Sequence, residues 1–356
     1  MAISPSPFLK QSTPKWGRWM RAAFWIALIQ AIISPAWSEE MQRFTYSRPT
    51  MGTVFTVTLY AADEALAQSA SEAALQRVED INQVASDYLP ESELSRLNRA
   101  PDHQAIPLSP DLFRLLDLSL KTAQVTDGAF DITCTYAVQL WRRARRQHKM
   151  PTQDQVDHAI AMTDWRALKL DPTKNTVMKL KPDLQIDLGG IGKGYAAHEA
   201  LQSLKRRGLP QALVAGSGDL AIGDPPPGEA GWDVTLRTFE KPEEKDRLVH
   251  IRLKNCGCST SGDLHQFLEL DGQRYSHIVD PKTGLGLTHR IACTIIAPTG
   301  ADSDAYDTPM CVLGKEAGLK LVANLPGVSA RFVLLGEKGE PEVFTTPGFP
   351  TSEALR

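Results

Sequence analysis

Residues 187–194, Asp-Leu-Gly-Gly-Ile-Gly-Lys-Gly, are the segment that most restricts how this chain can fold. A run so rich in glycine favours neither a helix nor a strand, so we expect a turn there. The flanking pattern predicts a strand at 184–187 and a helix that runs to Arg207, where Gly208 is placed to end it. A strand, a glycine turn and a helix should therefore follow one another directly.

The glycine turn also has a possible chemical role. Backbone amides at a turn that opens a helix can approach a phosphate closely, and Lys193 adds a positive charge. The segment is not a P-loop, which would need Gly at 187 and Ser or Thr at 194. Glycines at 190, 192 and 194 also fail the G-x-G-x-x-G dinucleotide pattern. A phosphate site and a purely structural turn both remain open.

A second polar cluster lies at 301–308, Ala-Asp-Ser-Asp-Ala-Tyr-Asp-Thr, directly before the apolar run 310–313. If this stretch is helical, Asp304, Asp307 and Thr308 share one face of the first turn. Clustered oxygen atoms suit a hard cation such as Mg²⁺. The alternative is helix capping, for which Asp, Ser and Thr are also the preferred residues.

The remaining pattern predicts a single large domain of the α+β class. Alternating residues at 51–60 predict a strand, and apolar residues at helical spacing over 66–81 predict a helix. Ser109-Pro110 is typical of a helix start, and that helix is expected to reach Thr126. Strands dominate the second half, and the clearest are at 212–215, 232–236, 248–253, 291–296 and 330–335.

The first 38 residues read as a signal peptide, which leaves 39–356 as the mature domain. Four basic residues precede a short apolar core, and Ala36-Trp-Ser38 offers small residues for cleavage. An uncleaved N-terminal anchor is the alternative. Removal of this segment takes away four of the 39 basic residues and none of the 42 acidic ones, so the net charge becomes −7. That charge argues against a nucleic-acid partner.

Three further features allow two readings each. The basic run at 142–149 is expected to be a solvated helix face, or else an anion or membrane-surface contact. The five cysteines have no regular spacing and are interpreted as buried small residues, with one disulfide as the alternative. His277 could accept a proton near neutral pH, or it could be a packing residue.

Taken together, the motifs resemble those of the FAD:protein FMN transferases, the ApbE-type flavin transferases. The resemblance runs from about Phe44 to Leu335. It rests on Met-Gly-Thr at 51–53, Ser-Asp-Tyr at 86–88, Ser-Glu-Leu-Ser-Arg-Leu-Asn at 92–98, Gly-Ala-Phe-Asp at 128–131, the glycine segment 187–195, Gly-Ser-Gly-Asp at 216–219, Thr-Ser-Gly at 260–262, His-Ile-Val-Asp-Pro-Lys-Thr-Gly at 277–284 and Asp-Ala-Tyr-Asp-Thr at 304–308.

The resemblance implies an exported, Mg²⁺-dependent enzyme that transfers FMN from FAD to a Thr or Ser hydroxyl of another protein and releases AMP. It implies two lobes with mixed or antiparallel sheets and flanking helices, and FAD in a cleft between the lobes. By resemblance, the FAD site is lined by Met51, Tyr88, Ala129, Phe130, Asp131, Asp187, Lys193 and Val279. The same comparison gives Mg²⁺ to Asp304, Asp307, Thr308 and a backbone oxygen near Gly190.

We take His277 as the proton acceptor in this reaction, with Asp304 as the second candidate. The implied acceptor is an envelope redox protein, and the implied location is the periplasm or cell envelope. Membrane association would come only through the acceptor or an uncleaved anchor. The alternatives are a Mg²⁺-dependent FAD pyrophosphatase and a non-catalytic FAD-binding accessory protein.

The chain departs from the family pattern at three places. Ser217 stands between two glycines that the family usually has side by side, His198 replaces an Asp, and Pro309 follows the metal cluster. Because Pro is tolerated in the first turn of a helix, we expect the metal site to survive.

Overall fold

The computed structural model describes residues 41–236, 239, 248–263, 266–336 and 339–351. The predicted signal peptide at 1–38 lies outside the described residues. Residues Met41–Arg356 form one unit by their contacts. Among the described helices, none combines the length and the apolar composition that a membrane span requires.

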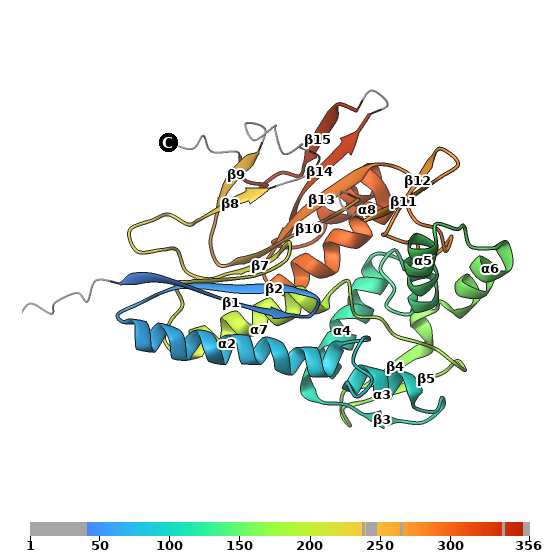
Figure 1. Ribbon diagram of the computed structural model, residues 1–356, viewed down its shortest axis with the longest axis horizontal. Helices are drawn as coiled ribbons and strands as arrows, with labels where there is room; N and C mark the ends of the chain where they lie inside the picture. The colour runs from blue at the N-terminus through green and yellow to red at the C-terminus, as the bar shows by residue number, and fades with distance from the viewer. Residues whose placement is uncertain (1–40, 237–238, 240–247, 264–265, 337–338, 352–356) are drawn as a thin grey trace, which may run out of the picture. The chain divides into compact units, whose positions relative to one another are not determined.

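An eight-stranded sheet forms the framework, with every neighbouring pair antiparallel (Figure 1). Its strands, in spatial order, are β1 (Gln42–Thr50), β2 (Thr53–Ala61), β6 (Ala212–Gly216), β7 (Asp219–Ile222), β10 (Cys256–Gly262), β13 (Ile291–Ala297), β14 (Ser329–Leu335) and β15 (Pro341–Thr345). The prediction of a single α+β domain with antiparallel sheets is confirmed.

Smaller sheets are inserted between the strands of the large one. The β8 (Trp232–Leu236) and β9 (Val249–Leu253) pair lies between β7 and β10 in the chain, and the β11 (Phe267–Leu270) and β12 (Gln273–Ser276) hairpin lies between β10 and β13. A three-stranded sheet contains β3 (Ile106–Pro107), β4 (Leu168–Asp171) and β5 (Thr176–Lys179). All five strands predicted in the second half are present, with bounds that differ by at most one residue at each end.

The predicted strand at 51–60 begins two residues late, because Met51 and Gly52 form the turn of the β1–β2 hairpin. Thr50 pairs with Thr53, so the loop has only two residues. Both have positive φ, 51° for Met51 and 70° for Gly52. Such a two-residue turn matches the right-handed twist of paired strands. A non-glycine residue held at positive φ is uncommon, and Met51 is one of the residues predicted to line the FAD site.

The described residues form seven α-helices, three of which make the main contacts with the large sheet. The seven are α2 (Glu64–Ala85), α3 (Glu93–Arg99), α4 (Pro110–Val125), α5 (Thr135–Gln147), α6 (Gln153–Met162), α7 (Gly192–Arg206) and α8 (Gly300–Val322), with a 3₁₀ turn at Trp165–Ala167. Helix α2 contacts β1, β2 and α7, whereas α8 contacts α7, β10 and β13 (Figure 1). The helices predicted at 66–81 and from Pro110 are confirmed, and the second of them is capped by Ser109.

The predicted strand at 184–187 is wrong, because this segment forms no regular element and pairs with no strand among the described residues. A side chain takes the place of a neighbouring strand. The Asn98 amide donates to the Ile186 carbonyl oxygen at 2.9 Å and accepts from the Ile186 amide at 2.8 Å. The segment ends where the Asp187 amide donates to the Ile132 carbonyl oxygen.

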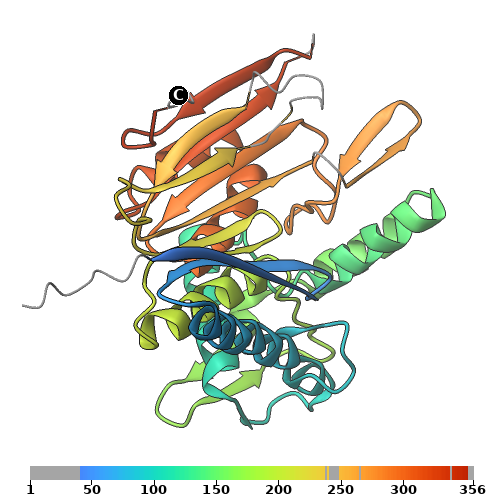
Figure 2. The same cartoon turned by 60° about the vertical axis from the view of Figure 1, so that its left-hand side comes forward.

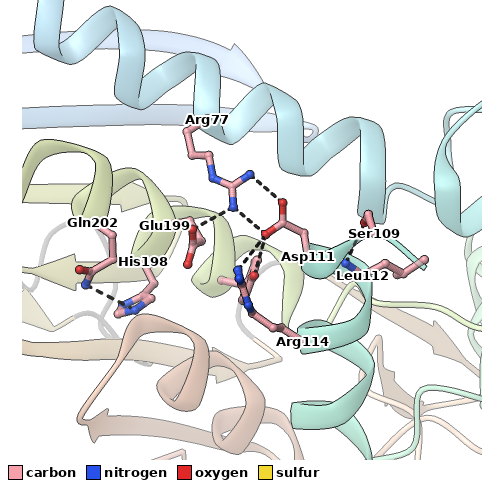
Figure 3. Close-up of polar contacts among 9 residues, drawn as sticks. Arg77, Ser109, Asp111, Leu112, Arg114, His198, Glu199 and Gln202 are labelled. Atoms are coloured by element: carbon pink, nitrogen blue, oxygen red, sulfur yellow. Dashed lines mark hydrogen bonds and ion pairs between the residues drawn. The ribbon is translucent and has the colours of Figure 1, made fainter. Parts of the chain in front are cut away.

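A network of charged side chains joins α2, α4 and α7 (Figure 3). Arg77 donates from both terminal nitrogens to the Asp111 carboxylate, at 2.7 and 2.6 Å, and to Glu199 at 2.8 Å. The Tyr195 hydroxyl also donates to Asp111, and Arg114 lies 3.5 Å from the same oxygen. Each acid in this network has a positively charged partner. His198, where the family usually has Asp, lies beside Gln202 on α7, 3.5 Å away.

On another side of the domain, α5, α6 and the β11–β12 hairpin lie together in both views (Figures 1 and 2). Helix α5 contacts both α6 and β11. Two of its arginines reach other segments: Arg142 donates to Asp187, which precedes the glycine turn, and Arg145 donates to Gln266, in front of β11.

Candidate active site

Two of the predicted metal ligands, Asp304 and Asp307, lie on the buried face of α8. We predicted that these residues lie in the first turn of the helix. The helix begins earlier, at Gly300, so they belong to its second and third turns. Thr299 caps the helix by accepting from the Asp302 amide at 3.1 Å. Capping therefore does not explain Asp304 and Asp307. Pro309 likewise lies inside the helix, where it removes one backbone hydrogen bond.

A third carboxylate, Asp219, completes the cluster and was missed at the level of sequence. One carboxylate oxygen from each of Asp219, Asp304 and Asp307 lies within 4.8 Å of the others. All three side chains are buried. Asp219 is the first residue of β7. Ser217 and Gly218 form the two-residue turn between β6 and β7. The Gly-Ser-Gly-Asp motif was the available signal, but it reads as an ordinary turn until β7 is placed beside α8.

Lys193 is the positive charge that faces this cluster. Its Nζ donates to Asp219 Oδ2 at 2.6 Å, and the Gly194 amide next to it donates to Asp304 Oδ2 at 2.7 Å. Burial alone would lower the pKa of Lys193, but the carboxylates of Asp304 and Asp219 raise it above its ordinary value. The first turn of α7 thus supplies both a charged side chain and a backbone donor to the acids.

The cluster holds more negative charge than Lys193 can balance. Burial, and next the charge of Asp219, raise the pKa of Asp304 to about 7. Burial, and then the charges of Asp304 and Asp219, raise the pKa of Asp307 well above its ordinary value. Asp307 Oδ1 is buried and has no hydrogen-bond partner within the described residues. A buried acceptor without a donor calls for a missing group.

The donor set fits a hard divalent cation such as Mg²⁺, which prefers oxygen ligands. Besides the carboxylates, the predicted ligand Thr308 presents its hydroxyl, which lies 3.1 Å from the Ser261 hydroxyl of β10. Gly190 lies in the turn before α7, where a Cβ atom would meet the Phe130 ring at 3.4 Å. The roles of Gly190 and Thr308 as ligands stay predictions.

The close packing of α7 against α8 sets the geometry of the cluster. At Gly194 an added Cβ atom would lie 2.3 Å from the Gly300 carbonyl oxygen and 2.4 Å from Asp304 Cβ. Real Cβ atoms do not come so close to their neighbours, so only glycine fits here. The absence of a side chain at 194 lets its amide reach the Asp304 carboxylate.

Several residues predicted to line the FAD site gather around the glycine turn. The Met51 methyl group lies 3.6 Å from where a Cβ of Gly192 would be, and Phe130 packs at Gly190. Ala129 is buried next to Phe130. Asp131 is also buried, but its two oxygens accept from Thr133 and the Trp165 amide, so it orders the local turn.

Val279 does not join that group, because it packs with Leu140 and Trp141 of α5 in a separate apolar cluster. Whether any of these residues contacts FAD stays a prediction, as does the cleft between two lobes.

Asp187 and Tyr88 are both in contact with Arg142, which the sequence did not indicate as part of the site. Arg142, expected to lie on a solvated helix face, is only 27% exposed and forms ion pairs with Asp87 and Asp187. Its guanidinium lies over the Tyr88 ring. The prediction of a solvated face holds for the exposed Arg143 and Arg146 and is wrong for Arg142. A run of like charges gave no signal that Arg142 is only partly exposed and paired with two acids.

His277 follows β12 and is held by the loop in front of β11. Its Nδ1 lies 3.1 Å from the Gln266 carbonyl oxygen, which also accepts the His277 backbone amide. If Nδ1 carries the proton that this bond needs, Nε2 keeps a free lone pair. Burial lowers the pKa of His277, although the bond to Gln266 acts in the opposite direction. A neutral imidazole with a free Nε2 is able to accept a proton near pH 7.

All five cysteines are free thiols in the structure, and Cys258, Cys293 and Cys311 are buried. They agree with the interpretation as small packing residues. Burial raises the pKa of Cys258 and Cys293, so neither thiol is activated as a nucleophile.

The model of the ApbE family matches residues 51–332 of the chain. The FAD:protein FMN transferase of Escherichia coli K12 is 31% identical over 280 residues, which cover 77% of this chain and 79% of that protein. The enzyme of the same name from Salmonella typhimurium is 30% identical and covers 85% of this chain and 87% of its own length.

Solved structures agree with these matches. The apo form of the flavinyl transferase ApbE from Pseudomonas stutzeri superposes with a TM-score of 0.76 at 27% identity, over 86% of this chain and 95% of that one. The flavin transferase ApbE from Vibrio cholerae gives a TM-score of 0.74 at 25% identity, over 87% of this chain and 98% of that one.

Proposed function

The chain belongs to the ApbE family, and from this premise we propose that it is an FAD:protein FMN transferase. The observation that carries the proposal is the buried cluster of Asp219, Asp304 and Asp307, with Lys193 beside it at the start of α7. Transfer of FMN requires that a charged pyrophosphate be bound and that its charge be balanced while a P–O bond breaks.

In this reaction the hydroxyl oxygen of the acceptor protein forms a bond to the FMN phosphorus of FAD. The bond from that phosphorus to the bridging oxygen breaks, and AMP leaves with that oxygen. The hydroxyl proton passes to a base, for which His277 Nε2 is our candidate, with Asp304 as the second. His277 is supported by the burial that lowers its pKa, which favours the neutral imidazole, and by the Nδ1 contact that orients its ring.

The chain's own residues bind and orient the pyrophosphate. Lys193, which lies at the start of α7 beside the carboxylates, would supply positive charge to the anionic oxygens. Asp304, Asp307 and Thr308 would hold Mg²⁺, with Asp219 shared between that site and Lys193. A bound Mg²⁺ supplies neutralisation of the charge on the pyrophosphate oxygens. Binding of a cation would balance the negative charge of these carboxylates, which explains why three of them are buried together.

We further propose that the protein acts outside the cytoplasm, in the periplasm or cell envelope, on an envelope redox protein with an acceptor Thr or Ser. The support is the sequence of segment 1–38, with its basic start, apolar core and small residues at the cleavage position. Mass spectrometry of the N-terminus of the exported protein tests this: a start at Glu39 supports cleavage, and an intact Met1 supports an anchor.

The activity is tested with the mature protein, FAD and Mg²⁺, with and without an acceptor domain that contains Thr. AMP release is followed together with in-gel flavin fluorescence of the acceptor. AMP and a covalently fluorescent acceptor support the transferase. AMP with only free FMN would make the protein a pyrophosphatase, and intact bound FAD would make it an accessory flavin-binding protein.

A further inference from the structure

Arg142, in the basic run, contacts two separate parts of the chain, the loop at 87–88 and the segment at Asp187. Its Nη1 donates to Asp87 Oδ2 at 2.8 Å, and its Nη2 donates to Asp187 Oδ2 at 3.0 Å. Its Cζ lies 5.1 Å from the centroid of the Tyr88 ring. Helix α5 thereby connects the loop after α2 to the segment that enters the glycine turn.

The contact with Asp187 reaches the backbone of the glycine turn. Asp187 is only 7% exposed, and its second oxygen, Oδ1, accepts from the Gly189 amide at 2.7 Å. The carboxylate is therefore fixed between a guanidinium and the turn that leads to Lys193. Loss of Arg142 would release one side of this carboxylate and leave the orientation of the turn to a single amide.

The contact with Tyr88 holds an exposed aromatic ring in place. Tyr88 is 73% exposed, although large aromatic side chains usually bury most of their surface. A guanidinium on one face of the ring attracts it and limits its rotation. An aromatic ring held this way offers its other surface to a planar ligand without first losing its freedom, which favours binding.

Electrostatics explains why an arginine stands here. Asp87 and Asp187 face the same guanidinium, so without Arg142 two carboxylates would face each other. Burial, and then the charge of Asp87, raise the pKa of Asp187, while Arg142 acts against both. Lys could balance one charge but could not span two carboxylates with separate nitrogens, as the planar fork of Arg does.

We propose that Arg142 is a positioning residue of the FAD site, which holds Tyr88 and the glycine turn in the arrangement that accepts the ring system of FAD. This proposal rests on the proposed function. Arg142 acts through Asp87, Tyr88 and Asp187, and it sets the affinity for FAD and not the rate of the bond-breaking step.

The test compares Arg142→Gln, Arg142→Lys and the matched control Arg146→Gln in the mature protein. Arg146 is exposed on the same helix, and its side chain makes no hydrogen bond or ion pair with the part of the chain that the structure describes. The Kd for FAD is measured from flavin fluorescence, and KM and kcat from AMP release. We expect Arg142→Gln to raise Kd and KM about tenfold to a hundredfold with kcat within about threefold. Arg142→Lys should recover part of this loss, and Arg146→Gln should match the wild type.

Two additional variants separate positioning from charge balance and from folding. Asp87→Asn in the Arg142→Gln background removes the repulsion between the carboxylates of residues 87 and 187. It does not restore the contacts that Arg142 made, so FAD affinity should stay low. Full recovery would reduce Arg142 to a neutralising charge and overturn the proposal. If Arg142→Gln does not fold, Tyr88→Ala tests the same surface, and an unchanged Kd there would overturn it.

The outcomes also separate this proposal from the proposed function. An unchanged Kd in folded Arg142→Gln, or a fall in kcat at constant Kd, overturns the positioning role while transfer by the wild type remains. If the wild type binds FAD without transferring FMN, the function fails, and the Kd comparison still decides the role of Arg142. If the wild type does not bind FAD, both fall.

Discussion

Helix α7 contacts two clusters of charged side chains, one at its first turn and one at its middle. Both clusters contain acidic and basic residues, but they differ in how many acids have a cationic partner. The first turn of α7 brings Lys193 to Asp219, Asp304 and Asp307, where one cation faces three buried acids. Its middle brings Glu199 to Arg77 and Asp111, where Arg114 stands nearby and each acid has a cationic partner (Figure 3). The difference indicates that the second cluster holds the fold together, whereas the first awaits a ligand.

The contrast follows from the cost of burying charge. A complete buried ion pair stabilises a protein little more than apolar residues of similar volume would. A buried charge whose partner is missing is strongly destabilising. Evolution therefore has little reason to keep an uncompensated acid such as Asp307 in a core unless another group binds it. A balanced network, in contrast, needs no function beyond packing.

The largest effect should come from Asp307→Asn, which takes one acid from the unbalanced cluster. We expect AMP release to fall by about three orders of magnitude, because charge neutralisation at the phosphates is lost. In EDTA the same variant should be more stable than the wild type, by about 1 kcal/mol, because a buried unpaired carboxyl is gone. Activity assays and urea unfolding measure the two effects.

The control for this variant is Asp302→Asn on the first turn of the same helix, which should keep its activity. Mg²⁺ should raise the thermal unfolding temperature of the wild type by a few degrees and leave that of Asp307→Asn unchanged. An Asp307→Asn protein that is less stable in EDTA would contradict the contrast drawn between the two clusters.

A second large effect is expected at His277, which lies outside both clusters. His277→Ala should lower kcat by about a hundredfold to ten-thousandfold, the usual contribution of a general base. The Kd for FAD should change little, because the ring is proposed to act on the acceptor hydroxyl. Flavin binding and transfer rates measure these quantities, and a loss of FAD affinity instead would assign His277 to the pocket.

Arg77→Met should show the opposite pattern, with a large effect on stability and little on activity. It leaves Asp111 and Glu199 without their shared partner, so we expect the free energy of unfolding to fall by about 3 kcal/mol. The kcat of the folded fraction should remain within about twofold. Arg146→Met is the matched control, because this arginine is exposed and its side chain forms no ion pair within the described residues, so the free energy of unfolding should change by less than about 0.5 kcal/mol.

The smallest expected effect is the pH dependence that Asp111 of the balanced network contributes to stability. Burial would raise the pKa of Asp111, but hydrogen bonds from Arg77 and Tyr195 outweigh it and lower the pKa. The ionised carboxylate therefore stabilises the fold above about pH 4, the ordinary value of an unfolded Asp, and this contribution is lost as the pH falls further. Urea unfolding from pH 6 to pH 3 should show a steeper loss in the wild type than in Asp111→Asn. Parallel curves would exclude Asp111 as the source.

Much of the fold was predictable because periodicity is a local property. The alternation before Ala61, the helical spacing in α2 and the Ser109 cap are encoded in neighbouring residues. The segment 184–187 has the same apolar alternation, but its partner is the side chain of Asn98, far away in the chain. Local pattern cannot distinguish a strand that pairs with a strand from one that pairs with an amide.

The site was predictable in part for the same reason. Asp304 and Asp307 share a helix face by their spacing alone, so they could be grouped without a structure. Asp219 joins them only because β7 lies beside β10 and α8, which is a property of the sheet order. Arg142 was concealed by its neighbours, since four arginines in a short run look equivalent until α5 is packed.

The close packing of α7 against α8 at Gly194 helps to distinguish related sequences that keep the metal cluster from those that have lost it. Any larger residue at this position would have to push α7 away from α8, and the Asp304 carboxylate would lose the amide that orients it. A homologue that keeps Asp304 and Asp307 but carries a side chain in place of Gly194 should therefore be counted among those that have lost the metal cluster. The absence of a side chain at position 194 is therefore a marker of the metal cluster alongside the two acids.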